Sequence, residues 1–191
     1  AMAAIHLWCV VTILSSTVSL SAGSQLTANL SHSYCYQLIN GHRYLEPGAS
    51  VDPNQYYHAY AVLAPTQTNS TTWKLISAHP TCFHLCNVRT GQYLMVAPND
   101  GVYAVNKTQL LSNTFAAFIF GPSYPDWPSR RARITNMLKM QPLCASSNQE
   151  LISQKPLIVA SSIQAGQEST GGTACEWELA EQPSCPSNDL C

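Results

Sequence analysis

The chain repeats one pattern of apolar residues three times, and this repetition limits its possible folds more than any single motif does. A hydrophobic pair recurs at Tyr44-Leu45, Tyr93-Leu94 and Leu143-Cys144. Further along each copy stands an aromatic-x-apolar segment: Trp73-Lys74-Leu75, Phe118-Ile119-Phe120 and Trp177-Glu178-Leu179. Because the order within each copy is the same, we expect three structural units at about residues 34–77, 82–122 and 132–180.

Each unit consists of short apolar runs separated by turn residues, which is typical of β-strands. The 9 glycines and 12 prolines are scattered between these runs, and no segment keeps a helical period over three turns. Four short strands bury little apolar surface alone, whereas three such units in a ring close a barrel and share one core. The sequence therefore predicts an all-β domain with Trp73, Phe118 and Trp177 in its core.

The pattern resembles the β-trefoil superfamily, whose members have three pseudo-repeats of four strands. The strongest likeness runs from Trp73-Lys74-Leu75 to 83-FHLCNVRTGQYL-94. This segment resembles ricin-B-type lectins, in which an aromatic strand is followed by an Asn-x-x-Ser/Thr-Gly-x-x-Leu hairpin. Here the hairpin residues are Asn87, Thr90, Gly91 and Leu94. The same run is similar to fibroblast growth factors and fascin-like trefoils, and the resemblance implies a β-trefoil over residues 34–182.

Two family signatures are missing from the sequence. Ricin-type repeats usually end in Gln-x-Trp, but the matching positions here read Thr71-Thr72-Trp73, Ala116-Ala117-Phe118 and Cys175-Glu176-Trp177. The receptor-binding and heparin-binding residues of the growth factors have no recognisable counterpart. The resemblance therefore specifies the scaffold, and ligand-binding residues have to be sought in the loops.

The first residues indicate secretion. The apolar, uncharged stretch 7–20 is short for a membrane span, which needs about 20 apolar residues, and the small residues 21–24 suit cleavage. We expect a signal peptide at 1–23 and an N-terminal extension at 24–33. Three N-glycosylation sequons, at Asn29, Asn69 and Asn106, fit this route and predict surface positions.

Seven cysteines remain after the expected signal peptide, and seven is odd. In an oxidising compartment, one thiol is then left over or joins a second chain in a disulfide-linked dimer. Cys82 and Cys86 would lie roughly 13 Å apart on one strand, at about 3.3 Å per residue, so they should not bond each other. We expect Cys185 and Cys191 to hold down a C-terminal tail at 183–191.

The composition also excludes several kinds of function. Charged residues make up 10% of the chain and the net charge is −1, which argues against a nucleic-acid partner. His-Glu-x-x-His, Cys-x-x-Cys and Gly-x-Ser-x-Gly motifs are missing. We therefore predict a non-enzymatic protein without catalytic residues, a metal or a cofactor.

The loop 121-GPSYPDWPSRRAR-133 is the most unusual segment between two units. Prolines restrict it, and aromatic side chains with polar groups are good anchors for ligands. We interpret Tyr124, Asp126 and Trp127 as candidate sugar-binding residues, with Asp126 accepting hydroxyls and Trp127 stacking on a ring. The alternative for Trp127 is that it caps the barrel.

Basic residues follow in the same loop, at Arg130, Arg131 and Arg133. Three interpretations remain open: a patch for an anionic glycan or acidic partner, a protease-exposed loop, or a solvated turn. We include Arg130 and Arg131 among the candidate ligand-binding residues.

The turn at Asn99-Asp100-Gly101 has two possible roles. Asn99 and Asp100 are candidate sugar ligands, since trefoil lectins can place an aspartate in such a turn. The same residues also form a strong two-residue hairpin signal, because Asn, Asp and Gly tolerate positive φ.

These features together predict a secreted recognition protein with lectin-like binding of a carbohydrate or glycoprotein. The competing prediction is a growth-factor-like or cytokine-like protein ligand, or a trefoil protease inhibitor acting through the 121–133 loop. One scaffold hosts all of these activities.

Overall fold

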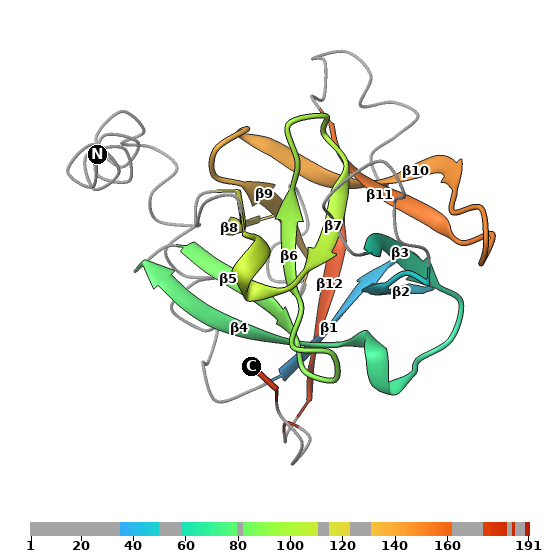
Figure 1. Cartoon of the computed structure of the whole chain (residues 1–191), viewed down its shortest axis with the longest axis horizontal. Helices are drawn as coiled ribbons and strands as arrows, with labels where there is room; N and C mark the ends of the chain where they lie inside the picture. The colour runs from blue at the N-terminus through green and yellow to red at the C-terminus, as the bar shows by residue number, and fades with distance from the viewer. Residues whose placement is uncertain are drawn as a thin grey trace.

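The computed structural model describes residues 35–49, 59–79, 82–110, 115–122, 131–161, 174–182, 185 and 190–191. Within them lie twelve β-strands in three groups of four (Figure 1). The first group is β1 (Cys35–Asn40), β2 (Arg43–Pro47), β3 (Ala59–Ala64) and β4 (Thr72–His79). The second is β5 (Cys82–Asn87), β6 (Tyr93–Val96), β7 (Val102–Val105) and β8 (Ala117–Pro122). The third is β9 (Arg131–Asn136), β10 (Gln141–Gln149), β11 (Pro156–Ala160) and β12 (Trp177–Gln182).

Two short 3₁₀ helices interrupt the strands. The first, η1 (Asn69–Thr71), precedes β4, and the second, η2 (Lys107–Gln109), follows β7. Thr68 caps η1, since its hydroxyl accepts the Ser70 N–H at 3.1 Å. Each helix therefore acts as a tight connection that turns the chain toward the next barrel strand.

The first and last strands of the three groups close a barrel. Antiparallel pairing runs from β1 to β4, β5, β8, β9 and β12, and β12 pairs back with β1. Every strand of this ring has two neighbours in it, so the barrel has no exposed edge. The closed ring confirms the prediction that three units would share one barrel.

The remaining six strands form three hairpins that cover one end of the barrel. They are β2–β3, β6–β7 and β10–β11, and β3 pairs with both β7 and β11. An isolated bridge between Gly101 and Val159 joins the second and third hairpins. This is the β-trefoil arrangement of three four-stranded pseudo-repeats, as the repetition in the sequence predicts.

The three aromatic residues of the repeat lie in the core. Trp73, Phe118 and Trp177 are each 0% exposed, which confirms their predicted place. The indole N–H of Trp73 donates to the Leu45 carbonyl at 2.9 Å, and that of Trp177 donates to the Leu143 carbonyl at 2.8 Å. Both bonds join a repeat's last strand to its second strand, so the two carbonyls occupy equivalent positions.

This equivalence corrects the alignment of the third repeat by one residue. Leu45 corresponds to Leu143, whereas the sequence pairs suggest that it corresponds to Cys144. Leu45, Leu94 and Leu143 are all fully buried. Cys144 forms a disulfide with Cys175 and is not the counterpart of Leu45.

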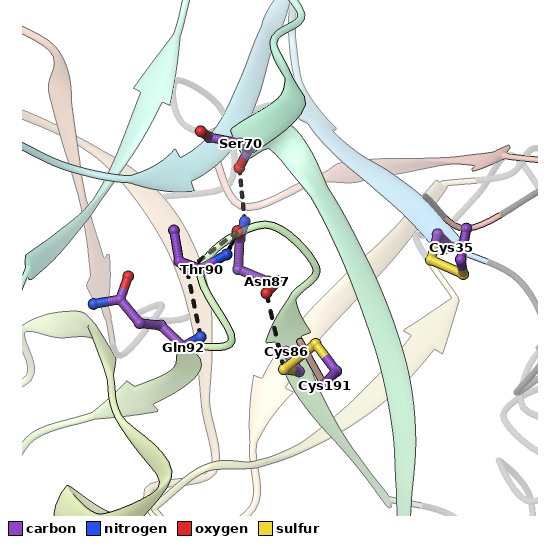
Figure 2. The surroundings of a disulfide bond; sticks show 8 residues. Cys35, Ser70, Cys86, Asn87, Thr90, Gln92 and Cys191 are labelled. Atoms are coloured by element: carbon purple, nitrogen blue, oxygen red, sulfur yellow. Dashed lines mark hydrogen bonds between the residues drawn. A yellow bond between two sulfur atoms is a disulfide. The ribbon is translucent and has the colours of Figure 1, made fainter. Parts of the chain in front are cut away.

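A buried asparagine ends the first strand of each repeat: Asn40, Asn87 and Asn136. In all three, the side-chain Nδ2 donates to backbone carbonyls just before the fourth strand of another repeat unit. For Asn87 the acceptor is the Ser70 carbonyl, at 2.7 Å (Figure 2). Because the asparagine and the fourth strand that it reaches belong to different repeats, each amide links two repeats.

The asparagines also organise the hairpin that follows. Asn87 Oδ1 accepts the Thr90 N–H at 3.2 Å, and Asn136 Oδ1 accepts the Lys139 N–H at 3.0 Å. Each turn then closes at a residue with positive φ, which is Gly91 (66°) in the second repeat but Met140 (53°) in the third. The third repeat therefore forms the same turn without the glycine that this backbone conformation favours.

Three disulfides connect the described cysteines. Cys35 bonds to Cys185, Cys86 to Cys191 and Cys144 to Cys175. The first two attach the C-terminal tail to the barrel strands β1 and β5, as expected for Cys185 and Cys191 (Figure 2). The tail also donates the Leu190 N–H to the Val88 carbonyl at 3.2 Å.

Cys82 lies outside these three bonds, and as predicted it is not bonded to Cys86. The expectation that the odd cysteine links two chains is not supported. Cys82 is 1% exposed on β5, so its thiol is not presented at the surface to a second molecule.

Candidate functional site

A shallow depression of about 90 Å³ lies on the outer face of the barrel. It is lined by residues of β1, the β1–β2 turn, β9 and the start of β12: Ile39, Gly41, Arg131, Glu176, Trp177 and Glu178. In the sheet, β12 lies between β1 and β9, so the depression crosses the junction between the third and first repeats. We define these six residues as the β12 depression.

Strand alternation places the polar groups of the β12 depression on one face. Trp177 is fully buried in the barrel, so Glu176 and Glu178 on either side of it point outward. The ladder pairs Glu178 with Ile39 on one side and with Arg131 on the other. An apolar, an anionic and a cationic side chain therefore stand in one row across three strands.

The segment that enters β12 is held from two directions. The Asn40 amide donates to the carbonyls of Ala174 and Glu176, at 3.0 and 2.8 Å. Between these two residues, Cys175 is bonded to Cys144 of β10. The wall that carries Glu176 is thus fixed before any ligand arrives, which lowers the entropy lost on binding.

None of the charged side chains of the β12 depression forms an ion pair with another described residue. Among the described residues, ion pairs are recorded for Lys139 with Asp100 and for Lys155 with Glu46, but not for Arg131, Glu176 or Glu178. The side chains of these three residues also form no hydrogen bond with other described residues. Their charges remain available to a ligand.

The predicted ligand residues Asn99 and Asp100 lie in a different place, in the β6–β7 turn. The Asp100 carboxylate already forms an ion pair with Lys139 at 2.6 Å, and Lys139 also donates to the Pro98 carbonyl at 2.8 Å. The Asn99 amide lies 3.4 Å from the Tyr103 hydroxyl, and its Oδ1 accepts the Gly101 N–H at 3.1 Å. The polar side chains of Asn99 and Asp100 are therefore engaged in contacts that stabilise the turn.

The turn itself differs from the predicted two-residue form. The Ala97 carbonyl accepts the Asp100 N–H, and the Ala97 N–H donates to the Gly101 carbonyl, so three residues form the loop. Asp100 has positive φ (65°), and Gly101 does not. Gly101 instead forms an isolated antiparallel bridge to Val159.

Of the other predicted ligand residues, the structure brings Arg131 into the depression. Tyr124, Asp126, Trp127 and Arg130 lie outside the described residues.

The predicted glycosylation sites are partly described. Asn69 is exposed in η1, and Asn106 is exposed at the N-cap of η2. Asn29, the signal peptide and the extension at 24–33 lie outside the described residues.

The sequence interpretation missed Glu176 and Glu178. A signal for them was present: if Trp177 faces the core, alternation sends both neighbours outward on the same face. Ile39 and Gly41 were harder to find, because their neighbourhood with β12 depends on a ladder that joins residues far apart in the sequence.

The described residues contain no group of three or more His, Cys, Asp or Glu side chains able to hold a metal ion. Among them there is also no helix that is long and apolar enough to cross a bilayer.

No protein-family model matches the chain, and no curated protein matches it. Solved structures do match over most of its length. BEL β-trefoil aligns with 80% of this chain and 96% of its own, at 11% identity and a TM-score of 0.55. A salivary protein of the cysteine- and tryptophan-rich family from Culex quiquefasciatus aligns with 79% of this chain and 97% of its own, at 17% identity and a TM-score of 0.56.

The lectin of Polyporus squamosus, bound to Neu5Acα2-6Galβ1-4GlcNAc, aligns with 79% of this chain and 50% of its own. Its identity is 8% and its TM-score is 0.56. Identities this low show a common fold and no more. The chain is therefore similar to β-trefoil proteins, lectins among them, in its architecture.

Proposed function

We propose that this protein is a secreted, non-enzymatic recognition protein that binds a carbohydrate, or the glycan of a glycoprotein, in the β12 depression. The observation that carries the proposal is the unpaired set of Arg131, Glu176 and Glu178 beside an apolar wall on rigid strands. Charged side chains that have no ion-pair partner among the described residues and line a concavity can supply the few polar groups that orient a ligand in its site.

The chemistry of these groups suits a sugar. Carboxylates accept hydrogen bonds from hydroxyls, and a guanidinium donates several in a fixed fork. Ile39 is half-buried at the opposite side of the row and offers an apolar contact to the C–H groups of a sugar ring. A ligand that carries hydroxyls on one edge and C–H groups on its face would satisfy all of them.

The context supports an extracellular ligand. Three disulfides indicate an oxidising compartment, and the exposed sequons at Asn69 and Asn106 fit the secretory route. A lectin and a salivary protein share the fold. The trefoil scaffold hosts unrelated activities, so these neighbours support the proposal only as an analogy.

A glycan array probed with the secreted, disulfide-intact protein tests the proposal. We expect binding to a defined set of glycans, and a loss of about tenfold or more in affinity on Arg131→Ala or Glu178→Gln, because each change removes a charged hydrogen-bonding group. Glu181→Gln is the matched control, since Glu181 is exposed on the same strand but outside the depression.

Two results would count against the proposal. If binding survives Arg131→Ala and Glu178→Gln but disappears on Asp100→Ala, the ligand occupies the β6–β7 turn instead. If no glycan binds and the protein attaches to cells in the presence of competing sugars, the protein-ligand alternative replaces the lectin-like one.

A further inference from the structure

The β12 depression carries more negative than positive charge. It contains two carboxylates, Glu176 and Glu178, and one guanidinium, Arg131. Arg133 lies two residues further along β9, and Arg43 lies in the β1–β2 hairpin, but neither lines the depression. A ligand in contact with the lining therefore meets an excess of anionic groups.

The arginine of the β12 depression lies directly beside a carboxylate in the sheet. Arg131 and Glu178 are direct partners in the β9–β12 ladder, and neighbouring strands lie about 5 Å apart. Glu176 lies just before β12, two residues from Glu178, a spacing of about 7 Å in extended backbone. Glu178 therefore has a cationic neighbour across the ladder and a second carboxylate two residues away.

Two other carboxylates among the described residues differ from this arrangement. Asp100 and Glu46 each have a lysine as ion-pair partner, Lys139 and Lys155. Glu46 also accepts the Thr68 hydroxyl, at 3.2 Å. Glu176 and Glu178 have no such partner among the described residues, so their acceptor capacity has to be met by water or by donors on the ligand.

We propose that Glu176 and Glu178 determine specificity: they make the β12 depression accept sugars that bear hydroxyl, acetamido or amino groups and reject sugars that bear a carboxylate or sulfate. This inference rests on the proposed function, and it names the ligand class of the same site. An ionised carboxylate accepts hydrogen bonds and donates none. An acidic sugar would leave both glutamates without donors and place like charges side by side, whereas Arg131 alone would attract it.

A preference for neutral sugars would distinguish this chain from a lectin that shares its fold. The Polyporus squamosus lectin is bound to a glycan that ends in Neu5Ac, an acidic sugar. The same glycan without that residue, Galβ1-4GlcNAc, is neutral, so the two form a matched pair of probes. Other neutral glycans can be paired with their sialylated and sulfated forms in the same way.

The experiment is an array of such matched pairs, probed with the secreted wild-type protein and the Glu176→Gln/Glu178→Gln variant. We expect the wild type to prefer the neutral member of each bound pair by at least tenfold. In the variant, whose amides keep the shape and can donate, the preference should fall to less than threefold or reverse. Glu181→Gln should keep the wild-type ratio, and thermal melts should show that all three proteins are folded.

Three outcomes would overturn the inference. A wild type that binds the acidic member equally well or better contradicts it while leaving carbohydrate binding intact. A neutral preference that the double variant retains shows that other residues set the specificity. Absence of any bound glycan, with a folded protein, refutes the proposed function itself and removes the inference with it.

Discussion

Replacing Asn136 by alanine tests whether the three buried asparagines hold the repeats together. The Asn136 side chain is fully buried and makes four hydrogen bonds. Its Nδ2 donates to the carbonyls of Phe115 and Ala117 at 2.9 and 3.4 Å, and its Oδ1 accepts the N–H groups of Leu138 and Lys139 at 3.1 and 3.0 Å.

The expected loss follows from these contacts. Three of the four bonds are well formed, and each contributes about 1 kcal/mol net. Alanine leaves the carbonyl and both N–H groups without their partner, so we expect the free energy of unfolding to fall by about 3 kcal/mol. For a domain of this size that corresponds to a decrease in Tm of about 6–12 °C.

Urea denaturation of the disulfide-intact protein measures the loss. Asn148→Ala is the control, because Asn148 is exposed on β10, and its stability should stay within about 0.5 kcal/mol of the wild type. Asn136→Asp separates hydrogen bonding from packing: the shape is kept, but an oxygen now faces two carbonyls. We expect Asp to destabilise at least as much as Ala.

The reasoning is refuted if Asn136→Ala costs less than about 1 kcal/mol, or if Asn136→Asp is clearly milder than Asn136→Ala. Either result would mean that the repeats are held by packing of the barrel core, with the asparagine as a passive filler.

Three further substitutions test the turns, the close contacts and the tail. Met140→Gly should raise the unfolding free energy by about 1 kcal/mol, because it relieves positive φ; equal or lower stability in urea would show that the side chain contributes more. Gly48→Ala should lose about 1–3 kcal/mol, since its Cβ would clash with the Glu150 carboxylate and lie 3.0 Å from the Tyr60 carbonyl oxygen, whereas Gly121→Ala meets nothing within 4 Å and should melt like the wild type. Cys191→Ser removes a disulfide with a sequence separation of 105 and should cost about 4–5 kcal/mol; a guanidinium midpoint unchanged from the wild type would contradict this.

The repeat architecture was predictable because its core residues are chemically distinctive. Trp73, Phe118 and Trp177 are large and aromatic and recur once in each repeat, and burial of such residues dominates the packing. The prediction failed by one residue in the third copy, where apolar character alone could not distinguish Leu143 from Cys144. Cys144 is buried as a partner in a disulfide and does not take the leucine's place in the repeat.

The candidate site was less predictable. Arg131 was found because it stands in an unusual loop, but its neighbours Ile39 and Glu178 are brought to it by two long-range ladders. Asp100 attracted attention because turn residues and sugar ligands are often the same types. The competing ion pair with Lys139 depends on the approach of two hairpins from different repeats, which no local pattern reveals.

The disulfide pairing has a consequence for synthesis of the chain. The partners of Cys35 and Cys86 follow 150 and 105 residues later, whereas Cys144 and Cys175 are only 31 apart. At about 5–20 residues per second, Cys35 therefore waits on the order of 8–30 s for its partner, with Cys82 and Cys86 emerging first. The native bonds can close only in the order Cys144–Cys175, Cys35–Cys185 and Cys86–Cys191, as each later cysteine emerges. Cysteines that instead pair in their order of appearance form wrong bonds, which an isomerase has to correct.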